Sequence, residues 1–221
     1  PKAKNYGSGS EWRLPREPDL IVDMSTDASK IPSDGVIDYQ YFVADPGFKK
    51  DTWVTAAEII PGDRGVVHHS ICFVRPPDGA DMRLGGWLAA YVPGQKPPSY
   101  DPRQGRLIPA GSTLVFQQHY TTNGQATEDI TRIGLVLGEE AQIEKQLLTI
   151  IAMDQSFVIE AGEANANVSG KFKQLPKVGE FLGISPHMHF RGKSFTLDAE
   201  FSQSGKTKRD PTLLKVPNYD F

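Results

Sequence analysis

The chain has 221 residues, of which 38% are hydrophobic and 23% are charged, a composition typical of a folded globular protein. Its formal net charge of −3 provides no basic surface, so we expect no nucleic-acid partner. No apolar stretch approaches the roughly 20 residues that a transmembrane helix needs. The single cysteine, Cys72, excludes an intramolecular disulfide framework, and its apolar neighbours predict a small core residue.

Short segments rich in Val, Ile, Phe, Tyr and Thr follow an extended linker at residues 1–17, and turn sequences with Gly and Pro separate them. This pattern predicts strands. The first series covers residues 36–43, 53–60, 66–74, 112–121 and 132–137. Asn123-Gly124 carries the strongest hairpin signal in the chain. Helical composition is confined to residues 138–146, which are too few for more than a turn of helix.

A second series of predicted strands follows the charged stretch that ends the first. It covers residues 146–153, 157–161, 167–173, 180–190, 194–202 and 212–216. We therefore expect an all-β protein with two tandem antiparallel β-sandwich, jelly-roll-like domains, at residues 18–142 and 143–221. The second series is shorter than the about seven or eight strands of a closed sandwich, so we expect the second domain to be truncated.

All five histidines fall in three places: His68-His69, His119, and the pair His187 and His189. Imidazole is the commonest metal ligand, and three imidazoles are enough to hold a transition metal. In a strand, His187 and His189 would project from the same face and could chelate one metal. His68 and His69 would point apart, so both can reach one metal only at a bulge, a strand end or a sharp twist. A neighbouring strand could bring His119 beside them.

Three neutral imidazoles without a carboxylate suit copper or zinc rather than magnesium or calcium. A zinc hydrolase on a β-sandwich is one alternative. A cupin-type iron site is disfavoured, because Lys193 and Ser194 stand where its carboxylate would follow the H-x-H pair. Gln117 and Tyr120 lie close to His119 in the sequence and are candidates to contact and orient the metal ligands, although packing is the favoured role for Tyr120.

The order HH, then Q-x-H-Y, then H-x-H resembles the copper type II, ascorbate-dependent monooxygenases, which include peptidylglycine α-hydroxylating monooxygenase and dopamine β-monooxygenase. The bacterial members, often fused to cytochrome c or thioredoxin-like modules, are the more similar. The resemblance covers roughly residues 18–221. It rests on the stretches DYQYFVADPGF, VTAAEIIPGDRGVVHHSICFV, FQQHYTTNG, SPHMHFRGKSFTLDAEF and VPNYDF.

The resemblance implies a role for each histidine. His68, His69 and His119 match the ligands of a first copper, which stores and passes an electron. His187 and His189 match two of three ligands of a second copper, where oxygen is activated and the substrate C–H bond is attacked. The third ligand in the family is a downstream methionine, and none follows His189 in this sequence. We therefore expect the second site to be incomplete unless the native polypeptide continues.

The resemblance also implies the function: a copper-dependent monooxygenase that hydroxylates an organic substrate with O2 and an external reductant, such as ascorbate or a partner cytochrome. Ser185 stands where the peptide-amidating members have an arginine, so a C-terminal glycyl peptide substrate is not expected. The chain begins without an initiator Met or a signal peptide, so we expect a processed or partial chain. The resemblance implies a location in the periplasm or outside the cell. The alternative is a non-catalytic copper-binding or structural module of a larger redox or surface assembly.

Overall fold

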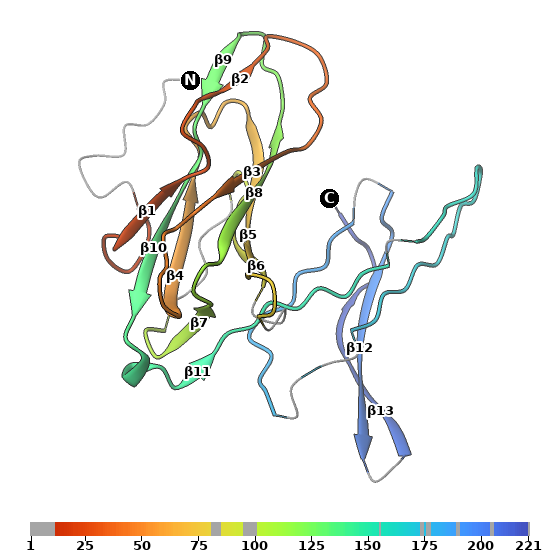
Figure 1. Ribbon diagram of the computed structural model, residues 1–221. Helices are drawn as coiled ribbons and strands as arrows, with labels where there is room; N and C mark the ends of the chain where they lie inside the picture. The colour runs from red at the N-terminus through yellow and green to blue at the C-terminus, as the bar shows by residue number, and fades with distance from the viewer. Residues whose placement is uncertain are drawn as a thin grey trace. The chain divides into compact units, whose positions relative to one another are not determined.

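A computed structural model describes residues 12–80, 85–94, 101–154, 156–172, 175, 178–188, 191–203 and 206–220. Strands make up nearly all of its regular structure, so the prediction of an all-β protein is confirmed (Figure 1). The chain divides into two compact units, residues 1–171 and residues 172–221. Among the described residues, no helix has the length and hydropathy to span a membrane.

The first unit contains a five-stranded sheet and a four-stranded sheet. In spatial order, the strands of the first sheet are β1 (Leu20–Asp23), β10 (Arg132–Gly138), β4 (Thr52–Ile60), β7 (Gln104–Ile108) and β11 (Lys145–Gln146). Those of the second are β3 (Gln40–Ala44), β8 (Thr113–Tyr120), β5 (Val67–Arg75) and β6 (Gly86–Tyr91). A short pair joins β2 (Ser29–Ile31) and β9 (Thr127–Asp129). Neighbouring strands are antiparallel except β7 and β11, which are parallel.

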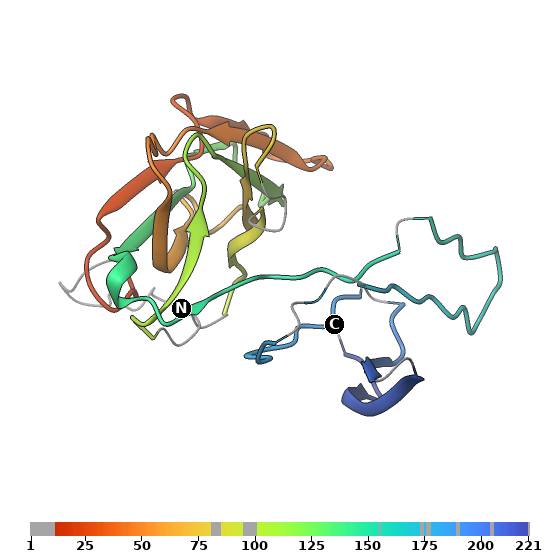
Figure 2. The same cartoon turned by 60° about the horizontal axis from the view of Figure 1, so that its bottom comes forward.

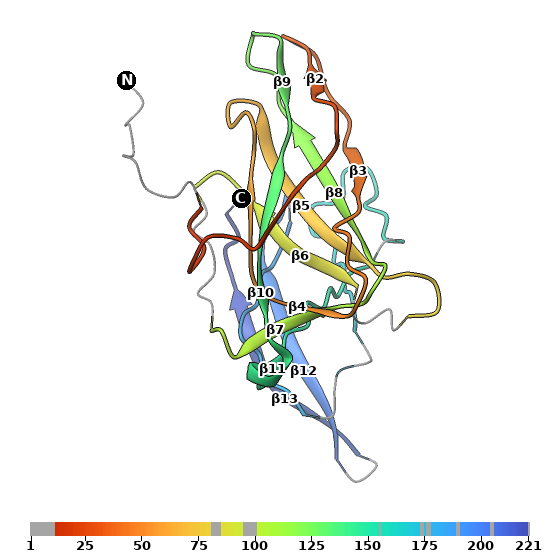
Figure 3. The same cartoon turned by 60° about the vertical axis from the view of Figure 1, so that its left-hand side comes forward.

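The hydrophobic core lies between these two sheets. Along β8, the alternate side chains of Leu114, Phe116, Gln118 and Tyr120 are at most 2% exposed, whereas those between them are only half-buried. The buried cluster combines such residues with others from the five-stranded sheet, for example those of β10. The first unit is thus a β-sandwich, and each large side chain buried in it stabilises the fold by roughly 1.5–3 kcal/mol. Figure 3 shows β8, β5 and β6 side by side in the second sheet.

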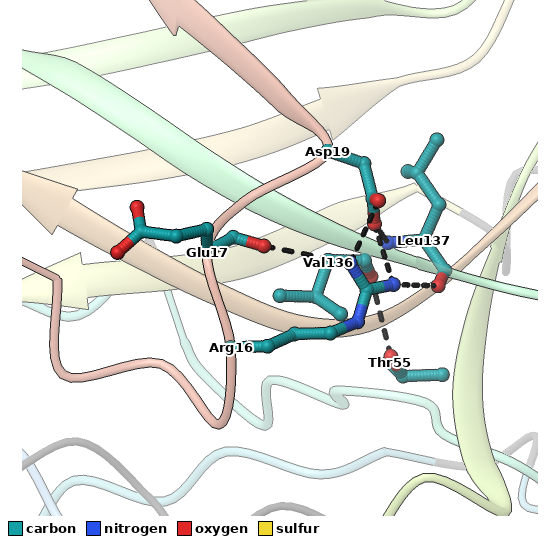
Figure 4. A network of polar contacts seen from close by, with 6 residues as sticks. All are labelled: Arg16, Glu17, Asp19, Thr55, Val136 and Leu137. Atoms are coloured by element: carbon teal, nitrogen blue, oxygen red, sulfur yellow. Dashed lines mark hydrogen bonds and ion pairs between the residues drawn. The ribbon is translucent and has the colours of Figure 1, made fainter. Parts of the chain in front are cut away.

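Polar contacts attach the segment before β1 to β10 (Figure 4). The Asp19 carboxylate accepts hydrogen bonds from Arg16 at 2.7 Å and from the backbone N–H of Leu137 at 2.7 Å. Arg16 also donates to the Leu137 carbonyl at 3.0 Å. The hydrogen bond from Arg16 holds the pKa of the Asp19 carboxyl below its usual value. On the other side of β10, the Thr55 hydroxyl donates to the Val136 carbonyl.

The strongest strand patterns of the first series are confirmed. The strands predicted at 53–60, 66–74, 112–121 and 132–137 match β4, β5, β8 and β10 within one residue at each end. The segment predicted at 36–43 becomes a strand only from Gln40 to Ala44. The stretch with helical composition forms a single turn of 3-10 helix, Glu140–Gln142. No prediction covered β2, β6, β7 or β9, which are short or carry few β-branched residues.

The hairpin predicted at Asn123-Gly124 is wrong in its strand pairing. A turn does form, with Gly124 at φ +89°, and the Asn123 side chain accepts a hydrogen bond from the backbone of Gln125. The strands on either side of it do not pair, because β8 lies between β3 and β5 while β9 pairs with β2. The Gly124 N–H instead donates to the Ser33 carbonyl, which fixes the turn against the loop after β2.

Four strands predicted in the second series are not formed among the described residues. Apart from Gln146 in β11, the described residues of the segments 146–153, 157–161, 167–173 and 180–190 contain no strand, and residues 147–154 and 156–171 form an irregular trace (turquoise in Figure 2). Their apolar side chains are exposed, for example Phe157 at 50%, Val158 at 76% and Leu182 at 58%. A strand needs a neighbour for its backbone hydrogen bonds, and alternation of residue types alone does not supply one.

In the second unit, β12 (Phe195–Gln203) and β13 (Lys206–Val216) form an antiparallel pair. The pair confirms the strand predicted at 194–202 and extends the one predicted at 212–216. The expected domain boundary at 142/143 lies within the first unit. There β11 pairs with β7, and the Leu147 N–H donates to the Gly105 carbonyl at 2.7 Å.

Candidate metal centre

Three histidines of the first unit converge at one end of the four-stranded sheet. His68 and His69 come from β5 and His119 comes from β8. Each histidine offers one ring nitrogen, and these three nitrogen atoms lie within 4.8 Å of one another. The ring centroids are 4.9–5.4 Å apart. His68 is exposed, while His69 and His119 are half-buried. The structure thus brings together the three residues of the predicted first site.

A β-bulge allows two consecutive histidines to face the same point. Val67 pairs with Tyr120 and His69 pairs with His119, so the register shifts between Val67 and His69 and His68 is the extra residue. The Nδ1 atoms of His68 and His69 consequently lie 3.2 Å apart. From the sequence, both histidines could reach one metal only at a bulge, a strand end or a sharp twist. The structure has a bulge at this place.

The loop before β5 holds the bulge in place. The Asp63 carbonyl accepts hydrogen bonds from the backbone N–H groups of Val66 and Val67 at 3.3 and 3.2 Å. The Val66 carbonyl in turn accepts from Thr121 at 2.8 Å, which connects this loop to the residue that follows β8. The Asp63 N–H donates to the Asp129 carboxylate at 2.8 Å. Both strands that carry histidines are therefore joined just beside the cluster.

Tyr120 lies in the core and not in the histidine cluster. Its hydroxyl donates to the Asp129 carboxylate at 2.9 Å, and its side chain is 2% exposed. Burial, followed by the nearby Asp129 charge, raises the pKa of the Tyr120 phenol. Asp129, itself 1% exposed, also accepts from the Thr131 hydroxyl at 2.9 Å. Tyr120 thus supports the fold around the strand end, in line with the packing role favoured for it.

Gln117 shares the outer face of β8 with His119, and its side-chain amide donates to the Tyr41 hydroxyl at 2.8 Å. Sequence reasoning missed Tyr39, whose ring stacks on that of His119 at a centroid distance of 4.7 Å and an angle of 25°. The sequence did carry a signal for this contact: Tyr39 and Tyr41 stand at alternate positions of the strand predicted at 36–43, so both would point to one face of it.

The predicted second site belongs to the second unit. His187 is exposed and lies outside any strand, and His189 falls outside the described residues. Next to His187, the backbone N–H and carbonyl of Met188 both bond to the Tyr219 hydroxyl, at 3.1 and 3.0 Å. The chelating pair of His187 and His189 therefore stays a prediction.

The cluster fits a transition metal that prefers nitrogen ligands. Bonds of about 2.0–2.1 Å to a tetrahedral or trigonal ion would separate the ligand nitrogens by about 3.3–3.6 Å, so the rings need to move by roughly 1 Å or less. Within the described part of the chain, no carboxylate belongs to this group. Cys72 is fully buried on the opposite face of β5, which confirms its core role, and burial raises the pKa of its thiol. Three neutral imidazoles can hold copper or zinc.

Comparison of the chain with known protein families, with curated proteins and with solved structures finds no match. The sequence resemblance and the geometry of the site therefore carry the functional argument.

Proposed function

We propose that His68, His69 and His119 bind one copper ion, which serves as the electron-storing centre of a copper-dependent monooxygenase. Such an enzyme would hydroxylate an organic substrate with O2 and an external reductant such as ascorbate. The observation that carries the proposal is the convergence of three imidazole nitrogens within 4.8 Å at a β-bulge that turns two consecutive histidines toward the third. The order of the histidines along the chain, which resembles that of the copper type II monooxygenases, favours copper over zinc.

In this proposal the protein supplies a fixed ligand set. His69 and His119 are direct cross-strand partners in a hydrogen-bonded sheet, so their separation changes little when the ion gains or loses an electron. The exposed His68 leaves one side of the cluster open to a reductant. Bound copper would supply one-electron chemistry at this position. We assign hydroxylation itself to a second copper at His187 and His189.

A partner cytochrome c or thioredoxin-like module and a location in the periplasm or outside the cell belong to the same proposal. They rest on the resemblance to bacterial members of the family.

The second candidate function is a non-catalytic copper-binding or structural module of a larger redox or surface assembly. One observation favours it: the first unit assembles its three-histidine cluster from its own two strands, so copper binding there needs no residue of the second unit. Oxygen consumption separates the two candidates. A copper-loaded monooxygenase should consume O2 with ascorbate and a substrate, while the module should bind copper without turnover across a broad substrate panel.

The first prediction concerns metal content. After incubation with copper and removal of loosely bound ions, elemental analysis should find about one copper per chain that is firmly held by the three imidazoles. His119→Ala should lose it, because the remaining two ligands come from a single strand. His187→Ala is the comparison: it removes a ligand assigned to the second copper but should leave the ion held by the three imidazoles in place, since all three lie in the first unit. Firm binding of zinc alone by the wild-type protein would refute the copper assignment.

A further inference from the structure

Tyr39 covers one side of the histidine cluster. It directly precedes β3, the edge strand that pairs with β8, and its ring is close to two of the three imidazoles. The ring stacks on His119 at 4.7 Å and 25°, and it lies 5.6 Å from the ring of His69 at an angle of 50°. Tyr39 itself is 43% exposed, so it forms the boundary between these imidazoles and solvent.

A parallel aromatic contact restricts how a histidine ring can turn. Rotation of the imidazole about its Cβ–Cγ bond would move it out of the stacked arrangement, which contributes about 0.5–1.5 kcal/mol beyond the area that it buries. The backbone pairing of β5 with β8 fixes the positions of the Cα atoms of His69 and His119, but it does not fix the orientation of their rings. A metal-binding histidine needs its ring held in one orientation, usually by a hydrogen bond from the ring nitrogen that does not bind the metal. For His119, the stacked Tyr39 ring restricts this orientation through ring contact.

We propose that Tyr39 is a positioning residue of the copper centre: it holds the ring of His119 in the binding orientation and closes the cluster on that side, which leaves His68 as the side of approach. The inference rests on the proposed copper site. It is carried by the ring contacts of Tyr39, which can be tested with and without copper.

Tyr39→Leu removes the aromatic ring, whereas Tyr39→Phe keeps it and removes only the hydroxyl. In the metal-free protein, NMR should show contacts between the Tyr39 and His119 rings, and Tyr39→Leu should shift the His119 ring resonances as the ring current disappears. Copper affinity should fall by about 2–12-fold in Tyr39→Leu, the fold-change equivalent to the energy of the stacked contact. Tyr39→Phe should bind copper as the wild type does.

Tyr41→Leu is the matched control. Tyr41 lies two residues further on the same face and is 61% exposed, and its hydroxyl bonds to Gln117 rather than to a histidine. We expect its copper affinity and its His119 resonances to be those of the wild type. Equal affinity of Tyr39→Leu and wild type, or no ring contact by NMR in the wild type, would overturn the inference. A wild-type protein that binds no copper but shows the ring contact would instead overturn the proposed function.

Discussion

The buried carboxylate of Asp129 links the loop before β5 to the end of β8, the two segments that position the three histidines. It accepts hydrogen bonds from the Asp63 backbone, in the loop that leads to His68, and from the Tyr120 hydroxyl, next to His119. Hydrogen bonds to a charged group are worth more than neutral ones, and donors left unpaired in the interior are costly. The position of the bulge relative to β8 thus depends on a residue that touches none of the three imidazoles.

Asp129→Ala should therefore lower the free energy of unfolding by about 3–5 kcal/mol, because it leaves several buried donors without an acceptor. Urea denaturation of the metal-free protein measures this. Glu128→Ala is the control, since its exposed side chain lies on the preceding residue of β9, and it should change stability by about 0.5 kcal/mol or less. Equal stability of the two variants would contradict the role assigned to Asp129.

At the scale of the strands, the sequence correctly predicted the strands that combine a long apolar run with a partner strand in a sheet. Both β5 and β8 were predicted within one residue, and the His68-His69 pair required an irregularity that the bulge provides. The contact of Tyr39 with His119 could not be predicted, because the two residues are 80 positions apart in the sequence and meet only because β3 lies next to β8. Residues 180–188 show the opposite case: a strand was predicted there from their apolar content, but they stay irregular because no strand pairs with them.

The attachment of β1 to β10 should weaken in acid. Because Asp19 has a lowered pKa in the folded protein, it binds fewer protons there than in the unfolded chain near pH 4. Its contribution is complete above the pKa of the unfolded state and is lost as pH falls through the folded value. Since the pair with Arg16 is partly exposed, the contribution is about 1 kcal/mol or less.

Asp19→Asn should thus lower the melting temperature at pH 7 and have a smaller effect at pH 2–3, where the wild-type carboxyl is protonated. Calorimetry at both values of pH tests this. Asp27→Asn, on the loop after β1, serves as a control for the general effect of losing one negative charge. A difference between Asp19→Asn and wild type that grows as pH falls would contradict the expectation.

At the scale of the molecule, the first unit holds its core within a continuous stretch of chain. The buried hydrophobic cluster runs from Val22 to Leu135, and the Trp12 side chain, 8% exposed, packs over Gly134, where an added Cβ would meet its ring at 2.8 Å. Arg106 connects the segment after β11 to the sandwich. This arginine is 5% exposed and donates to the Gly85 carbonyl at 2.6 Å and to the Thr149 hydroxyl at 3.1 Å. Burial lowers its pKa to about 10, so it remains charged at neutral pH.

We therefore expect residues 12–149 to fold and to bind copper alone. A fragment that stops at residue 142, the boundary predicted from sequence, lacks β11 and the hydroxyl that accepts from Arg106. It should be less stable by about 1–3 kcal/mol, the cost of leaving buried polar groups unpaired. Circular dichroism with thermal melting compares the two fragments. Equal melting temperatures, or a longer fragment that does not fold, would contradict the assignment.

The pairing of His69 with His119 has a thermodynamic consequence. The two residues lie 50 positions apart in the sequence and directly opposite each other in the sheet, so an ion held between them fastens two strands that the unfolded chain would let drift apart. An ion that binds only the folded state adds its binding energy to that of folding. If the ion is the proposed copper, each tenfold rise in free copper above the dissociation constant would add about 1.4 kcal/mol to the stability of the sandwich. The folded fraction of this unit would thereby report the copper supply of its surroundings.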